Sequence, residues 1–363
     1  HRTTGEIAKK DAVNELITGS FINARFGNLK INFNGIFTRY EHSILKSNQL
    51  YDLYDPEGKD FANLSGGYTY QIQRFTFFGE IAWAQNNAWA NLHGLSFYPG
   101  ESAGLALMYR NYQKDYLALH GYAMGENSSV QNEEGFYFGL EWLPFKYTKV
   151  NLYADLFKFP WLRYGEKAPT DGSEYLLNID YSPQRSIDIQ TRLKYEKKST
   201  TISDKQFADL VYGELYKWRI QATIDYTPEW SGQARLAYSY FEQDTASYNG
   251  WLLYYEHFYK PQKSNINASL RINIFDVEDY TARIYTYERD VLYSFSVPSF
   301  QDTGIRYYLN FKWDILERLS VYARIERTEF LHKDEISSGN ELIEGSGRTA
   351  IHTKLRLKQK NTK

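Results

Sequence analysis

Apolar and polar residues alternate along residues 217–227 of the chain. Trp218, Ile220, Ala222, Ile224 and Tyr226 are apolar or aromatic, and polar or charged residues occupy the positions between them. A period of two is typical of a β-strand with one apolar face and one polar face. The same alternation recurs at residues 29–38, 186–196, 233–241, 265–274, 318–328 and 349–358. We therefore predict an all-β protein whose antiparallel strands form a transmembrane barrel, with the apolar face of each strand turned outward to lipid.

Short turns and longer connections separate these strands in alternation. Gly, Pro and Asn favour tight reversals, and we assign the short turns to the periplasmic rim of a barrel. The short turns lie at residues 27–28, 73–74, 99–101, 144–146, 183–185, 228–230, 261–263 and 316–317. The longer connections, which we expect to be extracellular, lie at residues 41–60, 112–134, 159–173, 197–210, 243–249, 276–305 and 332–348, and the connection at 86–89 is the short exception on that side.

The turns predict about 17 strands in this chain. Eight short turns join sixteen strands, and residues 349–358 return once more from the extracellular side. Bacterial single-chain barrels normally have an even number of strands, so we expect an upstream segment to complete the wall. Residues 1–16 would be the remnant of an extracellular loop, partly helical, residues 17–358 the barrel, and residues 359–363 a polar tail.

Composition favours a transmembrane β-barrel over a helical membrane protein. The mean hydropathy is -0.58, and no uninterrupted apolar run approaches the roughly 20 residues that a spanning helix needs. The 33 Tyr, 22 Phe and 8 Trp suit rings at two lipid–water interfaces. The chain has no Cys, which excludes disulfides and is compatible with export, and its net charge of -2 predicts no general attraction to nucleic acid. We expect the outer membrane of a Gram-negative bacterium.

Several segments resemble the C-terminal barrel of a family of outer-membrane proteins that carry helix-hairpin-helix domains. Two of them read Tyr109-Arg110-Asn111-Tyr112 and Phe159-Pro160-Trp161-Leu162-Arg163-Tyr164. The others lie at residues 1–12, 125–135, 174–177 and 283–298.

The resemblance implies that helix-hairpin-helix repeats lie on a periplasmic part upstream of His1. DNA would be a partner only through that absent region. The C-terminus departs from the usual outer-membrane pattern, because residues 357–363 end on polar residues instead of an aromatic one.

Two groups of aromatic and basic residues are candidates for contact with a ligand or a partner. Residues 159–164 could form a stacking platform, or belong to the aromatic girdle or a loop that folds inward. The connection at 276–305 has too many rings to leave in water, and we expect it to pack inside the barrel mouth or against another protein. The candidate residues are Phe159, Trp161, Arg163, Tyr164, Tyr285, Tyr287, Tyr293 and Phe295.

Basic residues predominate at the inward positions of the clearest strands. They could attract an anionic solute or nucleic acid, or pair with carboxylates across strands, for example Arg324 with one on the adjacent wall. The expected lumen-lining basic residues are Arg192, Lys194, Arg219, Arg235, Arg271 and Arg324.

The chain carries no convincing catalytic, metal or cofactor motif. Its His residues are scattered without the spacing of a metal-binding pair, and no Ser/His/Asp set stands out. Asp52, Asp55, Glu57 and Asp60 surround Gly58, so a loop calcium is conceivable beside the simpler alternative of a solvated loop. We expect no catalytic residue, no metal and no cofactor.

Two functions remain open from the sequence. The one it favours is a non-enzymatic outer-membrane scaffold or conduit in an envelope complex, linked to periplasmic DNA handling through the absent helix-hairpin-helix region. The alternative is a diffusion channel or transporter for small polar or anionic solutes. The expected partners are membrane lipid and lipopolysaccharide, the upstream part of the same protein, and other envelope proteins.

Overall fold

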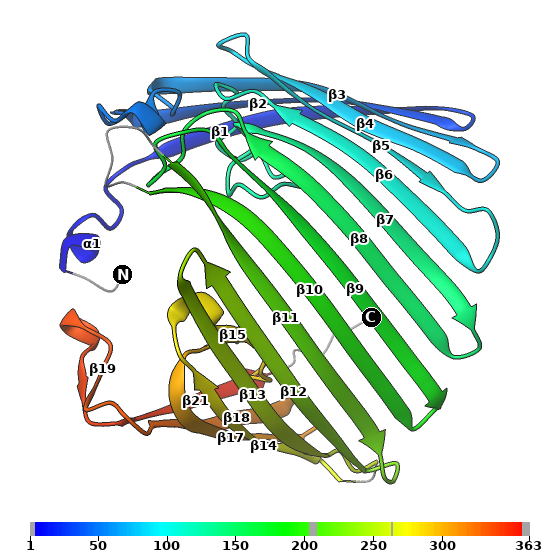
Figure 1. Ribbon diagram of the computed structural model, residues 1–363, viewed down its shortest axis with the longest axis vertical. Helices are drawn as coiled ribbons and strands as arrows, with labels where there is room; N and C mark the ends of the chain where they lie inside the picture. The colour runs from blue at the N-terminus through cyan, green and yellow to red at the C-terminus, as the bar shows by residue number, and fades with distance from the viewer. Residues whose placement is uncertain (1–3, 203–208, 263, 358–363) are drawn as a thin grey trace. The chain divides into compact units, whose positions relative to one another are not determined.

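The computed structural model describes residues 4–202, 209–262 and 264–357, and strands are the dominant elements in these ranges (Figure 1). The helices are α1 (Thr4–Ala8) and the short 3-10 helices η1 (Leu50–Asp52), η2 (Tyr280–Ala282) and η3 (Gly339–Glu341). No helix in these ranges is long and apolar enough to cross a membrane. The predicted all-β class is confirmed.

Seventeen strands belong to one sheet. They are β1 (Glu15–Phe26), β2 (Leu29–Ile44), β3 (Gly58–Ile72), β4 (Phe75–Ala84), β5 (Trp89–Phe97), β6 (Ala103–Tyr112), β7 (Glu133–Phe145), β8 (Thr148–Phe159), β9 (Thr170–Gln184), β10 (Ile187–Ile202), β11 (Asp209–Asp225), β12 (Trp230–Gln243), β13 (Ala246–Tyr259), β14 (Ile266–Val277), β17 (Asp302–Leu316), β18 (Leu319–Phe330) and β21 (Gly347–Leu357). Two further hairpins join β15 (Ile284–Tyr285) to β16 (Ser299–Phe300) and β19 (Glu335–Ile336) to β20 (Ile343–Glu344).

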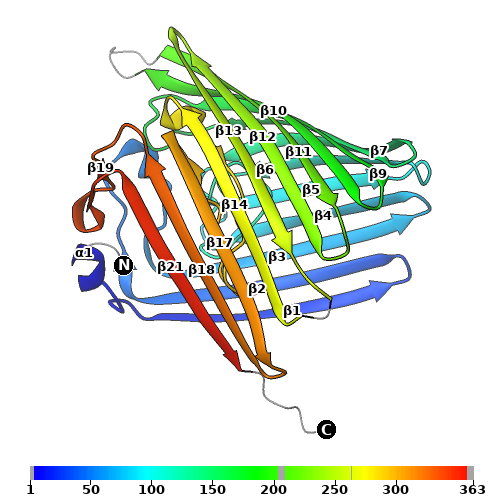
Figure 2. The same cartoon turned by 90° about the horizontal axis from the view of Figure 1, so that it is seen from below.

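The chain divides into two compact units. The N-terminal unit comprises residues 5–177 and 195–214, and the C-terminal unit comprises residues 1–4, 178–194 and 215–363. Within the N-terminal unit, each strand from β1 to β8 pairs antiparallel with the next. Within the C-terminal unit, the antiparallel order is β12, β13, β14, β17, β18 and β21, and Figure 2 shows the last four side by side.

On several strands apolar side chains are exposed and charged side chains are buried, which is the reverse of the pattern in a water-soluble protein. On β13, Trp251, Leu253 and Tyr255 are exposed, whereas Leu252, Tyr254 and Glu256 between them are buried. On β14, Ile272 and Ile274 are exposed, and the charged or polar residues beside them are buried. We call the exposed side the apolar face and the other side the polar face. The predicted alternation is therefore present, and charges occupy the sheltered side.

Two of the predicted long connections are shorter in the structure than predicted. Residues 243–249 contain a two-residue turn at Asp244 and Thr245, because β12 and β13 pair as far as Gln243 and Ala246. Asp244 takes the positive φ of 52° that such tight hairpins require. At 197–210, β10 extends to Ile202 and β11 begins at Asp209. Polar residues in both places continue strands that extend past the expected boundary.

The boundaries of several predicted segments and turns differ slightly from those in the structure. α1 lies within the predicted N-terminal segment, and β1 begins at Glu15, two residues before the predicted barrel boundary. The strands β7 and β9 continue through Phe145 and Gln184, so the tight turns there occupy the following two residues. The predicted polar tail at 359–363 lies outside the described residues.

Candidate functional site

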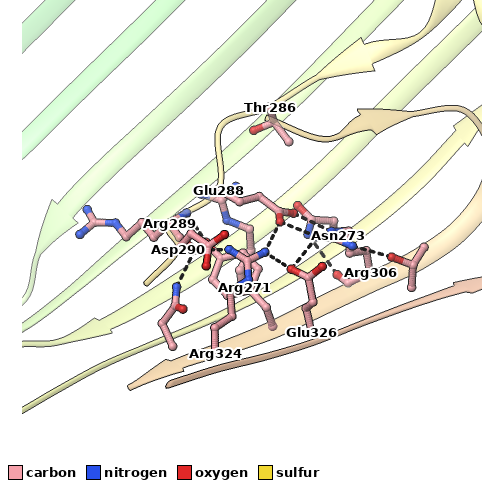
Figure 3. A network of polar contacts seen from close by, with 12 residues as sticks. Arg271, Asn273, Thr286, Glu288, Arg289, Asp290, Arg306, Arg324 and Glu326 are labelled. Atoms are coloured by element: carbon pink, nitrogen blue, oxygen red, sulfur yellow. Dashed lines mark hydrogen bonds and ion pairs between the residues drawn. The ribbon is translucent and has the colours of Figure 1, made fainter. Parts of the chain in front are cut away.

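The connection between β14 and β17, residues 278–301, folds back onto the polar face of the C-terminal unit. Glu288 in this connection is fully buried, and its carboxylate accepts hydrogen bonds from Nε and Nη2 of Arg306, each at 2.9 Å. Arg324 on β18 forms a second ion pair with the same carboxylate. Figure 3 shows Glu288 and Glu326 among these arginines, with Glu326 bonded to both. We call Glu288, Arg306, Arg324 and Glu326 the Glu288 clasp.

Main-chain groups of the connection are also bound by side chains of the sheet. Nη1 of Arg271 donates to the carbonyl oxygen of Tyr287 at 2.8 Å, and Asn310 donates to that of Arg289 at 2.7 Å. Arg324 also donates to the carbonyl oxygen of Arg289. Because backbone carbonyls buried beside a sheet need hydrogen-bond partners, these contacts fix the path of residues 287–289.

An apolar cluster holds the ends of the connection. Ala282, Ile284 and Phe300 pack with Leu252 and Phe275 from the underlying strands. The rings of Phe275 and Phe300 meet edge to face, with centroids 5.0 Å apart. Burial of these side chains places both ends of residues 278–301 against the sheet.

A carboxylate–histidine contact links the connection to the last strand. Nδ1 of His352 on β21 lies 3.0 Å from Oδ1 of Asp290, and the backbone N–H of Val291 donates to the same carboxylate oxygen. Burial raises the pKa of Asp290, but these hydrogen bonds outweigh it and hold the pKa below its usual value. The carboxylate therefore stays ionised at neutral pH and binds the connection to β21.

The candidate rings of the connection point away from its anchored backbone. Tyr285 and Tyr287 are about half exposed, and Tyr293 and Phe295 are largely exposed. Tyr287 and Phe295 lie with ring centroids 5.7 Å apart, and Lys354 lies 4.5 Å from the centroid of Tyr293. We call these four exposed residues of the connection the exposed aromatic group. The backbone of the connection packs against the sheet, but these four rings are not covered by it, contrary to the expectation that they would leave water. Their contact with another protein stays a prediction.

The expected basic residues of the polar face fall into two environments. Arg271 pairs with Glu256, its neighbour across β13 and β14, as cross-strand pairing predicts. Arg324 does not pair with a carboxylate of an adjacent strand. Its partners are Glu326 of its own strand and Glu288 of the connection. The prediction that Arg324 pairs with a carboxylate on the adjacent wall is wrong, because Glu288 of the connection pairs with Arg324 instead.

The remaining expected basic residues lie on β10, β11 and β12. Arg192 donates to the side-chain oxygen of Asn178, Arg219 to that of Gln190, and Arg235 to that of Gln221. Lys194 lies on β10, two residues after Arg192. These three arginines are therefore oriented by neutral amides.

The aromatic candidates at 159–164 belong to a packed set of connections in the N-terminal unit. Trp161 donates from Nε1 to the carbonyl oxygen of Leu50 at 3.1 Å, and its backbone is bonded to the side chain of Asn132. Lys114 lies 4.7 Å from the ring centroids of both Trp161 and Tyr54. These contacts join connections from three parts of the chain, which favours the structural interpretation of Trp161.

The other members of this group have separate environments. Phe159 is buried, and the guanidinium of Arg163 lies 3.7 Å from its ring centroid. Burial lowers the pKa of Arg163, and its Nη2 donates to Thr170. Tyr164 is exposed and meets Tyr51 edge to face at 5.5 Å. The four residues therefore do not form one stacking surface.

The acidic residues considered for calcium are engaged elsewhere. Asp60 pairs with Arg39, Glu57 with Lys46, and Asp55 accepts from Gln131. Among the residues that the structure describes, no group of three or more His, Asp or Glu side chains is arranged to hold a metal ion.

Glu288, Asp290 and Arg306 were not among the candidates from the sequence. Glu288 and Asp290 lie in a connection, where no periodic pattern marks a position as inward. Arg306 lies on β17, which showed no clear alternation at its start. The length of the connection and its many rings were the only available signals.

Comparison with solved structures gives the fold class. The chain resembles the copper transporter OprC, with 12% identity and a TM-score of 0.57 over 95% of this chain and 65% of that one. It also resembles the FrpB iron transporter from Neisseria meningitidis, with 10% identity and a TM-score of 0.51 over 96% of this chain and 65% of that one. The chain thus spans slightly less than two thirds of each, and shares the fold of outer-membrane β-barrels. No protein-family model matches it, and no curated protein matches it in sequence.

Proposed function

We propose that this chain forms part of the wall of a Gram-negative outer-membrane barrel that passes small polar or anionic solutes, and that residues 278–301 narrow the passage. The sequence favoured a scaffold, with transport as the alternative. The fold shared with two transporters and the charged residues of the polar face favour transport.

The distribution of exposed residues supports placement in a lipid bilayer. A strand that faces lipid on one side and a hydrated lumen on the other carries apolar residues outward and polar residues inward. Leu253, Ile272 and Ile274 are exposed on the apolar face, while Arg271 and Glu256 are buried opposite them. In water this arrangement would leave large apolar surfaces exposed and would bury charges.

The observation that carries the proposal is the Glu288 clasp. A long extracellular loop that only covered the barrel would not need a fully buried carboxylate held by two arginines of the wall. A buried charge is costly unless it is paired, so the clasp specifies one position for the connection on the polar face. A connection bound to the polar face would lie on the lumen side of the proposed wall, which is why we propose that it narrows the passage.

The scaffold hypothesis and the helix-hairpin-helix resemblance lead to separate proposals. Envelope partners would dock on exposed rings such as Tyr164 or Tyr293. DNA handling would need the upstream region and stays a prediction. Neither draws specific support from the Glu288 clasp.

Solute flux through the purified full-length protein in liposomes tests the proposal. We expect liposomes that contain the protein to admit small sugars and amino acids, with rates that fall steeply as solute size increases. Liposomes with heat-denatured protein are the control. Flux equal to that control, together with no ion conductance in planar bilayers, would overturn transport and favour the scaffold.

A further inference from the structure

Three arginines on neighbouring strands of the polar face bind only uncharged groups. Nε of Arg192 lies 3.2 Å from Oδ1 of Asn178, Nη2 of Arg219 lies 3.0 Å from Oε1 of Gln190, and Nε of Arg235 lies 2.9 Å from Oε1 of Gln221. Arg235 also donates from Nη1 to the hydroxyl of Thr286 in the connection. We call Arg192, Arg219 and Arg235 the arginine row.

The row differs from three other arginines on the polar face of the same unit. Arg271, Arg306 and Arg324 each pair with a carboxylate. Among the described residues, no ion pair includes a member of the arginine row. The charge of the Asp180 carboxylate acts on Arg219 without a direct ion pair, and its oxygens accept hydrogen bonds from Asn178 and Gln190.

The members of the row are close enough to repel one another. The charges of Arg235 and Arg192 both act on Arg219, and those of Arg271 and Arg192 act on Arg235. Nε of Arg219 is buried and has no hydrogen-bond partner. Repulsion between neighbouring positive charges is unfavourable, and so is a buried N–H donor without an acceptor. A bound anion would offset both costs.

Aromatic packing holds part of the row in place. Tyr254 on β13 is almost fully buried, and the guanidinium of Arg235 lies 5.3 Å from its ring centroid. The hydroxyl of Tyr254 lies 2.8 Å from Oε1 of Gln233 and 3.2 Å from Oε1 of Gln221. Because Arg235 donates to the same Oε1 of Gln221, these contacts orient Arg235. These contacts restrict the side chains before any ligand arrives.

We propose that the arginine row is a binding site for a tetrahedral oxyanion, such as phosphate or the phosphate group of a small monoester. This inference rests on the proposed transport function, because it identifies a class of transported solute. Anion binding to the arginine row can nevertheless be measured without measuring transport. Guanidinium groups bind phosphate through paired N–H donors, and lysine cannot reproduce that geometry. Three guanidinium groups offer more N–H donors than the two oxygens of one carboxylate can accept. A tetrahedral oxyanion has more acceptor oxygens and therefore fits the arginine row better.

Calorimetric titration of the purified full-length protein in detergent tests the site. The probes are inorganic phosphate and glycerol 3-phosphate, which distinguish a free anion from a phosphorylated solute. We expect at least one to bind, with affinity reduced at least tenfold in Arg219→Gln. Arg327→Gln is the matched control, because it removes one charge from the outward side of β18 and should change affinity less than twofold.

Arg219→Lys separates a shaped site from general attraction. It keeps the charge and should still weaken binding several-fold, whereas Arg327→Gln should not. Circular dichroism and heat-modified gel mobility identify variants that have folded. No binding of either probe to the wild-type protein, or equal binding to wild type and folded Arg219→Gln, would overturn the site. Phosphate binding without solute flux would leave the site intact and overturn the transport proposal.

Discussion

The carboxylate of Glu288 and the guanidinium of Arg306 form two parallel hydrogen bonds of 2.9 Å between the 278–301 connection and β17. Paired bonds of this kind fix orientation as well as distance. Since Arg324 and Glu326 complete the same cluster, the connection is held to the wall by charge as well as by apolar packing. The connection therefore has a fixed position on the polar face.

Chemical labelling at Phe295 should obstruct the passage. The chain has no Cys, so Phe295→Cys introduces a single thiol at a largely exposed position of the connection. We expect a charged thiosulfonate reagent to reduce the ion conductance of this variant by a third or more. Leu45→Cys, equally exposed in the first long connection, is the control. Equal reductions in both variants would contradict a position of Phe295 in the passage.

Replacing Asp290 should remove a pH-dependent part of stability. The folded-state pKa of Asp290 is depressed, so its contribution is fully present above the unfolded pKa of about 3.9 and is lost as pH falls through the folded pKa. Asp290→Asn should cost about 1.5–3 kcal/mol at pH 7, the range for hydrogen bonds to a charged group. The difference in Tm between the two proteins should disappear in strong acid. A difference that is constant from pH 7 to pH 2 would contradict this role.

A charge on the apolar face should be tolerated poorly. Leu253 lies near the middle of β13 and is exposed. In a bilayer, Leu253→Arg should cost roughly 2–4 kcal/mol if the residue lies near the midplane. Leu331→Arg, just beyond the end of β18, should have little effect. Denaturant titration in liposomes measures both, and an equal effect of the two substitutions would argue against lipid contact at Leu253.

A methyl group at Gly135 should disturb a buried charge cluster in the N-terminal unit. Arg110 pairs there with Glu133 and Asp155, and a Cβ on Gly135 would lie 2.4 Å from the Arg110 Cζ. Gly135→Ala should therefore destabilise the folded protein by about 1–3 kcal/mol. Gly100→Ala is the control, since nothing lies within 4 Å of its Cβ. Equal Tm values for the two variants would contradict the tight contact.

The regular part of the fold was predictable, because strand alternation depends on local geometry. Trp251, Leu253 and Tyr255 lie on one exposed face of β13. Their alternation does not depend on how the connections fold. The strand extensions around 197–210 were missed, since polar residues at the outer ends of strands resemble loops in composition. Glu288 was missed because its partners lie 18 and 36 residues away and meet it only when the connection folds back. Arg192, Arg219, Arg235, Arg271 and Arg324 were predicted to face inward and Arg306 was not, and the division into paired and unpaired arginines required the contacts.

Single-channel conductance of Glu288→Gln in planar bilayers tests the central claim most directly. The substitution removes the charge that holds the connection, and Glu344→Gln removes the same charge from an exposed position in β20. We predict that Glu288→Gln conducts at least twice as much as the wild-type protein, or opens far more often, while Glu344→Gln conducts like the wild type. Identical conductance in all three folded proteins would contradict the claim that residues 278–301 narrow a passage.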